Sequence, residues 1–254
     1  MDAPDGLISI IVPVYNAGLY IEETIAMVMA QTCENWELIL VDDCSEDDSR
    51  AKIERFMAGN SGKIRLIAKD VNEGAARARN TGIEAARGRY IAFLDADDVW
   101  MPDKLERELS FMREKGAAFV FTAYEFGDEN AKGTGKAVHV PAVLTYEKAL
   151  SRTVIFTSTV LLDTKETGRK IIRMPEVKSE DTATWWKLLR NGYAAYGLDE
   201  VLVIYRRPAK SLSSNKLEAV RRIWNLYRKQ EALSVGCSCY NLFFWALRAT
   251  LRRL

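Results

Sequence analysis

The sequence predicts an α/β protein with a doubly wound, mostly parallel sheet and a C-terminal helical extension. Short apolar runs rich in β-branched residues alternate with segments whose apolar residues recur at helical spacing, and this alternation is typical of a parallel sheet covered by helices. The chain has 254 residues, of which 48% are hydrophobic, and this is enough for a substantial core in one domain or one and a half.

The alternation is regular over the first half of the chain. Helical spacing occupies residues 20–30, the stretch after Ser45, residues 74–86 and the stretch that begins at Pro102. In such sheets ligands bind outside the carboxyl ends of the strands, so residues that follow a strand are the first candidates for a site. Apolar runs with the length of buried strands occupy residues 7–14, 36–41, 64–67, 90–94 and 117–124.

The pattern is less regular after Tyr124. Residues 127–141 are rich in Gly, Lys and Asp and predict a loop. We expect a strand at 202–205 because this run is apolar and β-branched. Helices are predicted at residues 182–191, 217–233 and 240–254.

Composition and charge argue against several classes of protein. The formal net charge is +1, which gives no support for a nucleic-acid partner. The four cysteines include no Cys-x-x-Cys pair and there is one histidine, so zinc-ligand spacing is absent and reduced thiols in a cytoplasmic protein are the expected state. Residues 1–6 do not resemble a signal peptide, and no apolar run is long enough to span a bilayer.

Three carboxylates, Asp95, Asp97 and Asp98, directly follow the strand at 90–94. Like charges packed this closely repel, and burying one of them unpaired is costly. Magnesium and manganese prefer oxygen ligands and commonly combine one or two carboxylates with substrate phosphates. The motif therefore indicates a divalent cation held against a diphosphate, although a strand-end turn in which aspartates accept backbone hydrogen bonds would use the same residues.

Two other polar clusters lie at the ends of predicted strands. Asp42 and Asp43 follow the strand at 36–41, where they either cap the next helix or accept the imide N–H of a uracil ring. Tyr15 follows Pro13 at the end of the first strand and would lie against such a base. Three polar clusters at one edge of a sheet are hard to explain by packing alone.

The helix predicted from Gly74 begins with small residues and arginines, including Arg79, after Asn72. Glycine permits close approach of a backbone, and a helix N-terminus favours anions. The alternative is a helix of small residues that packs tightly on the sheet with its arginines exposed. Glu180 and Asp181 precede the helix at 182–191, and an acid in this position is either a cap or a general base.

The last predicted helix, at residues 240–254, interleaves Phe243, Phe244 and Leu247 with arginines. This composition is typical of a helix that lies on anionic lipid. The alternative is a helix that packs on the domain and leaves Arg248, Arg252 and Arg253 exposed.

Taken together and in order, five motifs resemble those of the family-two inverting glycosyltransferases, and the resemblance covers roughly residues 7–214. It implies the A-type glycosyltransferase fold, a nucleotide-diphospho-sugar donor and a single displacement that inverts the anomeric carbon. The motifs are Ser9-Ile10-Ile11-Val12-Pro13-Val14-Tyr15-Asn16, Val41-Asp42-Asp43-Cys44-Ser45, Asn72-Glu73-Gly74 with Ala78-Arg79-Asn80-Thr81-Gly82, Phe93-Leu94-Asp95-Ala96-Asp97-Asp98, and Glu180-Asp181.

The resemblance also implies roles for single residues. Asp97 would be the direct metal ligand, Asp95 would face the ribose or the metal shell, and Asp181 would be the catalytic base. Asp42 or Asp43 would read the base. The expected donor-binding set is Pro13, Tyr15, Asn16, Asp42, Asp43, Asn72, Gly74, Arg79, Asp95, Ala96, Arg206 and Lys210, and the expected acceptor-binding set is Glu180, Trp185 and Trp186.

The two tryptophans are included because adjacent residues of a helix differ in direction by about 100°. We therefore expect that Trp185 and Trp186 do not both face the core and that one lines an acceptor cleft. One departure from the family pattern is Pro208, which stands where many relatives carry a histidine near the diphosphate. Arg206, Arg207 or Lys210 would neutralise the diphosphate instead.

The sequence thus predicts an inverting glycosyltransferase that uses Mn²⁺ or Mg²⁺ and a UDP-sugar, with a glycan or lipid-linked acceptor in surface-polysaccharide synthesis. We expect a glycosyltransferase domain at 1–214, with a nucleotide-binding half at about 7–124 and an acceptor half at about 125–214, and amphipathic helices at 215–254 on the cytoplasmic membrane face. Two alternatives are a sugar-nucleotide nucleotidyltransferase, although residues 13–18 are not its glycine-rich loop, and an inactive nucleotide-sugar-binding protein, which only Pro208 favours.

Overall fold

The first half of the chain forms the predicted alternation of strands and helices. The structure is a computed structural model that describes residues 6–60, 62–207 and 216–251. Pro208 and Lys210 lie outside these residues, so the predictions that concern them stay predictions. The elements of this half are β1 (Ile8–Val14), α1 (Ile21–Met29), β2 (Trp36–Asp42), α2 (Ser49–Asn60), β3 (Ile64–Ala68), α3 (Ala75–Ala85) and β4 (Tyr90–Phe93).

The second half contains more short elements than the sequence predicts. The prediction of a loop at 127–141 is wrong for residues 133–138. This segment is a strand that pairs antiparallel with the strand before it, and the pairing satisfies the backbone hydrogen bonds of the segment. The elements are β5 (Val99–Trp100), α4 (Lys104–Lys115), β6 (Phe119–Gly127), β7 (Gly133–Val138), β8 (Val143–Leu144), α5 (Tyr146–Leu150), the 3₁₀ turn η1 (Thr157–Thr159), β9 (Val160–Asp163), α6 (Thr164–Thr167), α7 (Glu180–Arg190) and β10 (Ala195–Arg206).

The described strands form one sheet, whose main path runs β3-β2-β1-β4-β9-β6-β10-β5. The first four strands along this path are parallel, as predicted, whereas β9 is antiparallel to both β4 and β6. The chain moves outward from β1 to β3 and then returns to place β4 on the other side of β1. This reversal is the topological switch point at which doubly wound sheets bind ligands.

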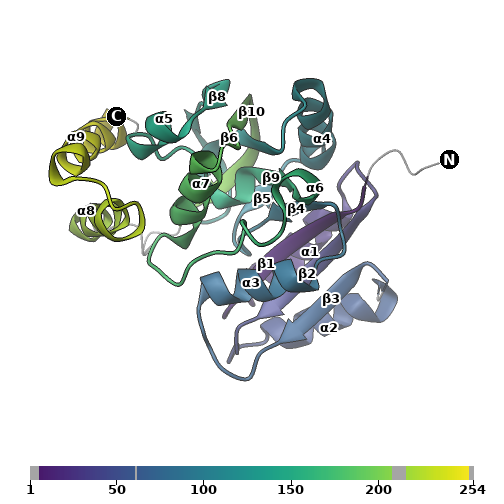
Figure 1. The fold of residues 1–254 in the computed structure, drawn as a ribbon. Helices are drawn as coiled ribbons and strands as arrows, with labels where there is room; N and C mark the ends of the chain where they lie inside the picture. Colours follow the sequence, from purple (N-terminus) through teal and green to yellow (C-terminus); the bar gives the residue numbers. More distant parts are fainter. Residues whose placement is uncertain (1–5, 61, 208–215, 252–254) are drawn as a thin grey trace.

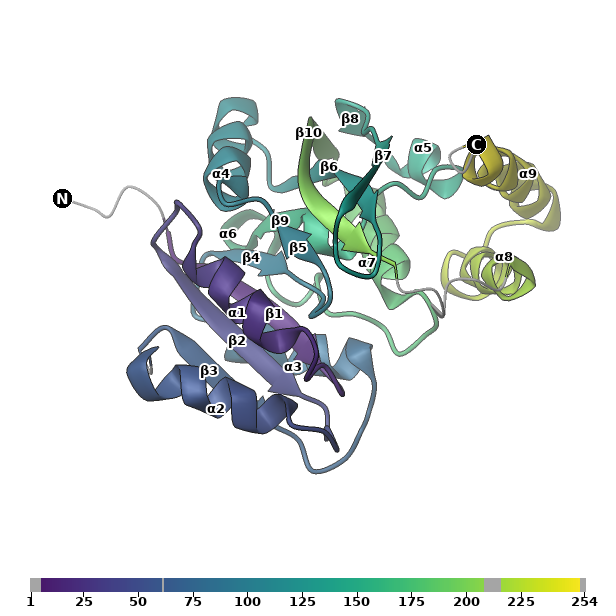
Figure 2. The same cartoon turned by 180° about the vertical axis from the view of Figure 1, so that it is seen from behind.

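Helices cover both faces of the sheet, which explains why its strands read as continuous apolar runs. On one face lie α3 and α7 (Figure 1), in a core that includes Ile11 of β1, and on the other lie α1 and α2 (Figure 2), in a core that includes Ile10 and Val12. Successive side chains of β1 point to opposite faces of the sheet, so they contribute to two hydrophobic cores, one on each face.

Trp185 and Trp186 correct the prediction that one of them lines a cleft. Each is 2% exposed. Trp185 faces the sheet, with ring centroids 5.9 Å from Phe93 and 5.6 Å from Phe119, whereas Trp186 stacks on Tyr227 at 5.3 Å. The prediction is wrong because α7 has a second layer of protein on its other side, which the helix period alone does not show.

That second layer is the C-terminal segment, made of α8 (Lys216–Asn225), the π-helix η3 (Leu226–Gln230) and α9 (Val235–Leu251). It lies beside α5 and α7, far from α2 (Figures 1 and 2). The helix predicted at 217–233 is present over residues 216–230, because α8 continues directly into η3, and it ends before Ala232, which has φ 50°.

The last helix packs on the domain and also exposes apolar side chains. The α9 helix packs on the domain, since Trp245 Nε1 donates to Thr153 Oγ1 at 2.9 Å and Arg248 Nη1 donates to the Ser151 carbonyl at 2.9 Å. Yet Tyr240 and Phe243 are each 64% exposed. None of the helices in the described ranges is long and apolar enough to cross a membrane.

Candidate active site

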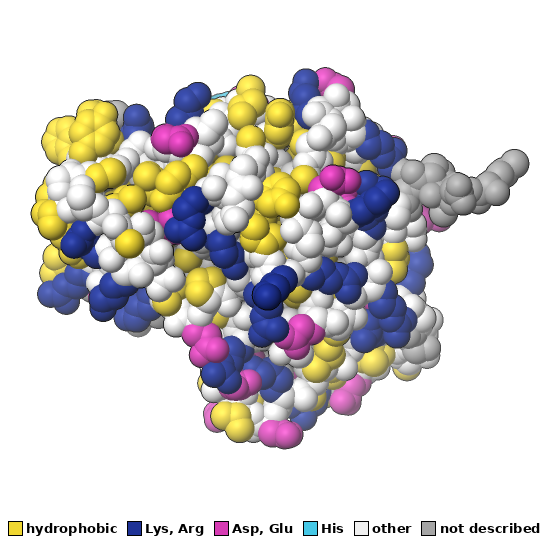
Figure 3. Space-filling model, in the orientation of Figure 1, with side chains coloured by type: hydrophobic (Ala, Val, Ile, Leu, Met, Phe, Trp, Pro, Cys, Tyr) yellow, Lys and Arg dark blue, Asp and Glu magenta, His cyan; other side chains and the backbone are white. Residues whose placement is uncertain are grey.

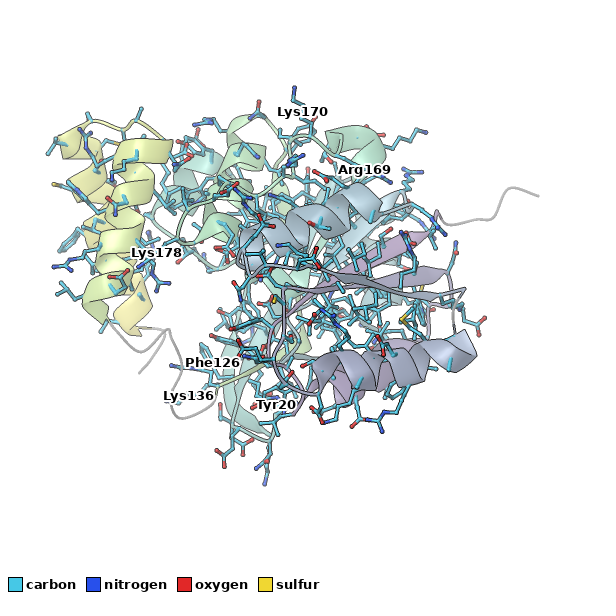
Figure 4. The ribbon with its side chains drawn as sticks, turned by 90° about the horizontal axis from the view of Figure 1, so that it is seen from below. Tyr20, Phe126, Lys136, Arg169, Lys170 and Lys178 are labelled. Carbon is cyan, nitrogen blue, oxygen red and sulfur yellow. The ribbon has the colours of Figure 1, made fainter. Side chains whose placement is uncertain are left out.

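A pocket of about 550 Å³ opens at the switch point of the sheet, where β1, β2 and β4 end. Most of the predicted donor-binding residues meet in its wall although they come from four separate segments of the chain. Tyr20, which sequence reasoning did not select, also contributes; Figure 4 labels it. The predicted residues in the wall are Pro13, Tyr15, Asn16, Asp43, Asn72, Gly74, Arg79, Asp95, Ala96 and Asp97.

Asp43 shapes the wall by holding the loop that leads into α3. Its carboxylate accepts hydrogen bonds from the backbone N–H of Gly74 at 2.6 Å and of Glu73 at 3.1 Å, and from Lys69 Nζ at 2.5 Å. Gly74 has φ 88°, a conformation that residues with a Cβ rarely adopt. The glycine is therefore needed for the turn itself, before any contact with a ligand is considered.

Asp42 is the member of the pair that the structure turns away from the pocket. Its side chain is fully buried and accepts a hydrogen bond from Arg50 Nη2 of α2 at 2.7 Å. Neighbouring residues at a strand end point to opposite faces, so only one of the two aspartates can reach the ligand side. The donor-binding prediction is thus corrected for Asp42, and of the two aspartates only Asp43 lines the pocket among the described residues.

Arg79 joins the two acidic motifs. Its Nη2 donates to Asp95 Oδ1 at 2.5 Å and its Nη1 donates to Glu180 Oε1 at 2.7 Å, and the residue is 6% exposed. Burial alone would lower the pKa of Arg79, but the two carboxylates raise it above its usual value. A permanently charged guanidinium therefore connects the acids after β4 to those at the start of α7.

The acids after β4 have unequal surroundings. Asp98 is buried, and its carboxylate accepts hydrogen bonds from Ser158 Oγ and from the backbone N–H of Arg206. Asp97 lines the pocket instead, where burial and the nearby charge of Asp95 raise its pKa. A cation between Asp95 and Asp97 would remove this electrostatic penalty.

The carboxylates at the pocket wall suit a metal ion that is bound jointly by the protein and a substrate. Among the described residues, no three His, Cys, Asp or Glu side chains are grouped closely enough to hold a metal ion by themselves. Asp95 and Asp97 supply two carboxylates at the pocket wall. Magnesium and manganese commonly bind through such a pair together with phosphate oxygens and water, so these residues fit the predicted cation.

Arg206 has a structural role that differs from the predicted one. It is 5% exposed, and it donates from Nε to the Asp97 carbonyl at 2.7 Å and from Nη2 to Glu23 Oε2 at 2.6 Å. Its guanidinium also lies over the Tyr20 ring at 4.7 Å. Because these protein groups occupy its donors, Arg206 fixes the turn that carries Asp97 rather than facing a diphosphate. The neighbouring Arg207 lies over the Phe126 ring, with its guanidinium carbon 5.1 Å from the ring centroid.

Asp181 is half-buried in the first turn of α7, next to Glu180. Its Oδ2 accepts a hydrogen bond from Thr157 Oγ1 at 3.1 Å and its Oδ1 accepts one from the Thr182 N–H. Asp181 does not line the donor pocket itself, but Glu180 connects it to Arg79 in the wall. Thr157 and Ser158 of η1 were missed in the sequence, where the only signal is a run of three hydroxyl residues before an apolar run.

A model of glycosyl transferase family 2 matches residues 9–164, which is more than half of the chain. The protein belongs to this family. It is accordingly a glycosyltransferase, as the order of its motifs predicts. A putative teichuronic acid biosynthesis glycosyltransferase of Bacillus subtilis, TuaG, is 41% identical over 249 residues, which cover 98% of each chain.

Another relative shows how far the similarity extends. An Escherichia coli protein, WfgD, is 38% identical over 223 residues, which cover 87% of this chain and 85% of WfgD. It is described as a UDP-Glc:α-D-GlcNAc-diphosphoundecaprenol β-1,3-glucosyltransferase. Both alignments extend past the segment matched by the family model, so they include most of the second half of the chain.

Solved structures confirm the A-type fold. Staphylococcus aureus TarS, in complex with UDP-GlcNAc, superposes with a TM-score of 0.71 at 21% identity, over 94% of this chain and 71% of the TarS chain. A mannosyltransferase from Pyrobaculum calidifontis, in complex with GDP-Man and Mn²⁺, also gives 0.71, at 18% identity over 95% and 69% of the two chains. At these identities the likeness concerns the fold alone.

Proposed function

We propose that the protein transfers a sugar from a UDP-sugar to a hydroxyl group of a lipid-linked glycan during surface-polysaccharide synthesis. The observation that carries this proposal is the Arg79 bridge, which ties Asp95 in the pocket wall to Glu180 beside Asp181. It links a donor site and a candidate base in one network. The names of TuaG and WfgD support the class of product, and that of WfgD supports the class of donor and acceptor.

In this proposal Asp181 is the general base. The acceptor oxygen attacks the anomeric carbon, the bond from that carbon to the diphosphate breaks, Asp181 takes the hydroxyl proton, and the nucleoside diphosphate leaves. Thr157 and the Thr182 N–H each donate to one carboxylate oxygen, which holds the group in place. A single displacement of this kind inverts the anomeric configuration.

Asp97 and Asp95 would hold Mn²⁺ or Mg²⁺, which stabilises the charge that develops on the departing diphosphate. The protein contributes the position of these ligands. Arg206 holds the Asp97 carbonyl, and Ser158 holds the neighbouring Asp98. The turn is therefore fixed from two sides before the donor arrives.

The exposed side of α9 favours peripheral binding to the cytoplasmic face of the membrane. Val235, Tyr240, Phe243 and Leu247 are 57%, 64%, 64% and 46% exposed, an unusual amount of apolar surface for one helix. Aromatic and aliphatic side chains of this kind insert into the boundary between headgroups and acyl chains. A lipid-linked acceptor would be found at that surface.

The substitution Asp181→Asn tests the proposal, with Asp103→Asn as a matched control, since the Asp103 side chain before α4 is 43% exposed and lies outside the pocket wall. We expect sugar transfer to fall by about 10²–10⁴-fold, the usual contribution of a general base. Affinity for UDP, measured by calorimetry with Mn²⁺, should stay close to that of the wild type.

Three results would contradict parts of the proposal. Normal turnover in Asp181→Asn would remove the base assignment. A product that keeps the anomeric configuration of the donor, seen by NMR, would exclude inversion. Absence of turnover with every UDP-sugar, despite donor binding, would favour the alternative of an inactive nucleotide-sugar-binding protein.

A further inference from the structure

A second pocket, of about 340 Å³, lies between α8, η3 and the segment that precedes α7. Four cationic side chains line it, Lys178, Arg221, Arg222 and Lys229, against a single carboxylate, Glu218. We call it the basic pocket. Figure 4 shows Lys178 next to the C-terminal helices, whereas Arg169 and Lys170 lie over another part of the molecule.

The positive charge of the basic pocket is only partly neutralised by the protein. Lys178 Nζ pairs with Glu218 at 2.7 Å. In the part of the chain that the structure describes, Arg221, Arg222 and Lys229 have no ion-pair partner. The Nε–H of Arg222 is in addition buried without a hydrogen-bond acceptor there. This buried donor is a local cost within the protein, whereas the cationic side chains of the pocket that lack an ion-pair partner would attract an anion.

The basic pocket lies close to the candidate base. Lys178 precedes Asp181 by three residues, and three residues of extended chain span at most about 11 Å. Within this short segment Glu180 reaches Arg79 in the wall of the donor pocket, while Lys178 lines the basic pocket. Asp181 therefore stands in a stretch of chain that contributes to both pockets.

The helix α9, which has an exposed apolar side, directly follows the elements α8 and η3 that line the basic pocket. Space-filling atoms show Lys and Arg side chains gathered over α8, with hydrophobic side chains above them over α9 (Figure 3). The exposed apolar residues of α9 include Tyr240 and Phe243. Hydrocarbon, phosphate and sugar would thus meet apolar surface, cationic surface and Asp181 in that order.

We propose that the basic pocket binds the diphosphate of the lipid-linked acceptor. This inference rests on the proposed function and adds to it the group by which the acceptor is recognised. Arginine forks match phosphate oxygens bidentately, and the lysines add point charges, so the set fits a diphosphate better than a neutral glycan. The sugar attached to the diphosphate would then extend toward Asp181.

The test compares two acceptors that differ only in the diphosphate: GlcNAc linked through diphosphate to a short polyprenyl chain, and GlcNAc linked directly to the same polyprenyl chain. The variants are Arg222→Gln and Lys229→Gln, and Lys170→Gln, an exposed residue elsewhere, is the control. We expect each pocket variant to raise the KM for the diphosphate acceptor by about tenfold, which corresponds to about 1.4 kcal/mol. The neutral acceptor and the hydrolysis of the donor in the absence of acceptor should be unaffected.

An equal effect on both acceptors, or no effect on either, would overturn the inference. Lys229 is exposed, so its replacement keeps the test valid if Arg222→Gln does not fold. If the wild type does not turn over any UDP-sugar, the proposed function fails separately. Calorimetry with inorganic pyrophosphate, at saturating UDP and Mn²⁺, then decides: binding that is lost in Arg222→Gln supports the basic pocket, and its absence refutes it. Preferential binding of phosphatidylglycerol vesicles through the same residues, without competition by pyrophosphate, would assign the pocket to membrane headgroups and also overturn the inference.

Discussion

Replacement of Arg79 by Gln tests the central electrostatic feature of the site. The change removes two charge-assisted hydrogen bonds, to Asp95 and Glu180, and leaves both carboxylates beside further acids. Each such bond contributes about 1.5–3 kcal/mol. The Asp95 and Glu180 side chains are 27% and 20% exposed, so water recovers part of the loss and the lower end of the range applies. We expect a loss of about 3 kcal/mol in the free energy of unfolding, or about 6–12 °C in Tm for a chain of this size.

The loss should depend on pH in a defined direction. Burial raises the pKa of Glu180 and Arg79 opposes that rise, so the substitution lets the pKa rise further. A carboxylate with a raised folded-state pKa destabilises the protein above that pKa, and the cost disappears as the pH falls toward the unfolded value. The stability difference between variant and wild type should therefore be smaller at about pH 5 than at about pH 7.5.

Calorimetric unfolding at the two pH values measures both effects. The matched control is Arg173→Gln, because Arg173 pairs with Glu84 of α3 and so links the same two regions of the chain, with side chains that are 54% and 57% exposed. An exposed pair of this kind contributes about 0–1 kcal/mol. If Arg79→Gln costs no more than Arg173→Gln, the bridge does not hold the two motifs together and the reasoning is wrong.

Three further predictions concern single groups of the site and the core. Thr157→Val removes the hydroxyl that holds Asp181 and should lower kcat about tenfold with unchanged UDP affinity, as one hydrogen bond contributes about 1 kcal/mol or more; an unchanged kcat would contradict the positioning role. Asp97→Asn should abolish the gain in donor affinity that Mn²⁺ provides, measured by calorimetry with and without the metal, and a full gain in the variant would exclude Asp97 as a ligand. Trp186→Ala should cost about 3–5 kcal/mol in chemical denaturation because the ring is buried against Tyr227, while a change confined to the KM of the acceptor would restore its predicted role in the cleft.

The parts of the fold that the sequence predicts are those with a strong local signal. The strands β1, β2 and β4 are buried on both faces, so each reads as an unbroken apolar run, and the polar residues after them reach one pocket because parallel strands end at the same edge. Local reasoning also places Asp181 at the start of a helix.

The remaining features depend on contacts between distant segments. β9 has four residues and no period that separates it from a loop, and its place in the sheet is set by its partners. The direction of Asp42 depends on Arg50 of α2, and that of Arg206 on Glu23 and the Asp97 carbonyl. The spacing of residues in the sequence does not predict these pairings, and it does not predict that Tyr227 of η3 covers Trp186.

The central position of β9 has a consequence for how the protein is made. β4 is the last of the four parallel strands in chain order, and its free edge is paired only when residues 160–163 reach it. Until some seventy residues beyond β4 have left the ribosome, an apolar strand presents unpaired N–H and C=O groups, which is the arrangement that promotes intermolecular association. Any fragment that ends before Val160 keeps that edge open permanently and should aggregate, whereas one extended through Asp163 gains the strand that closes it.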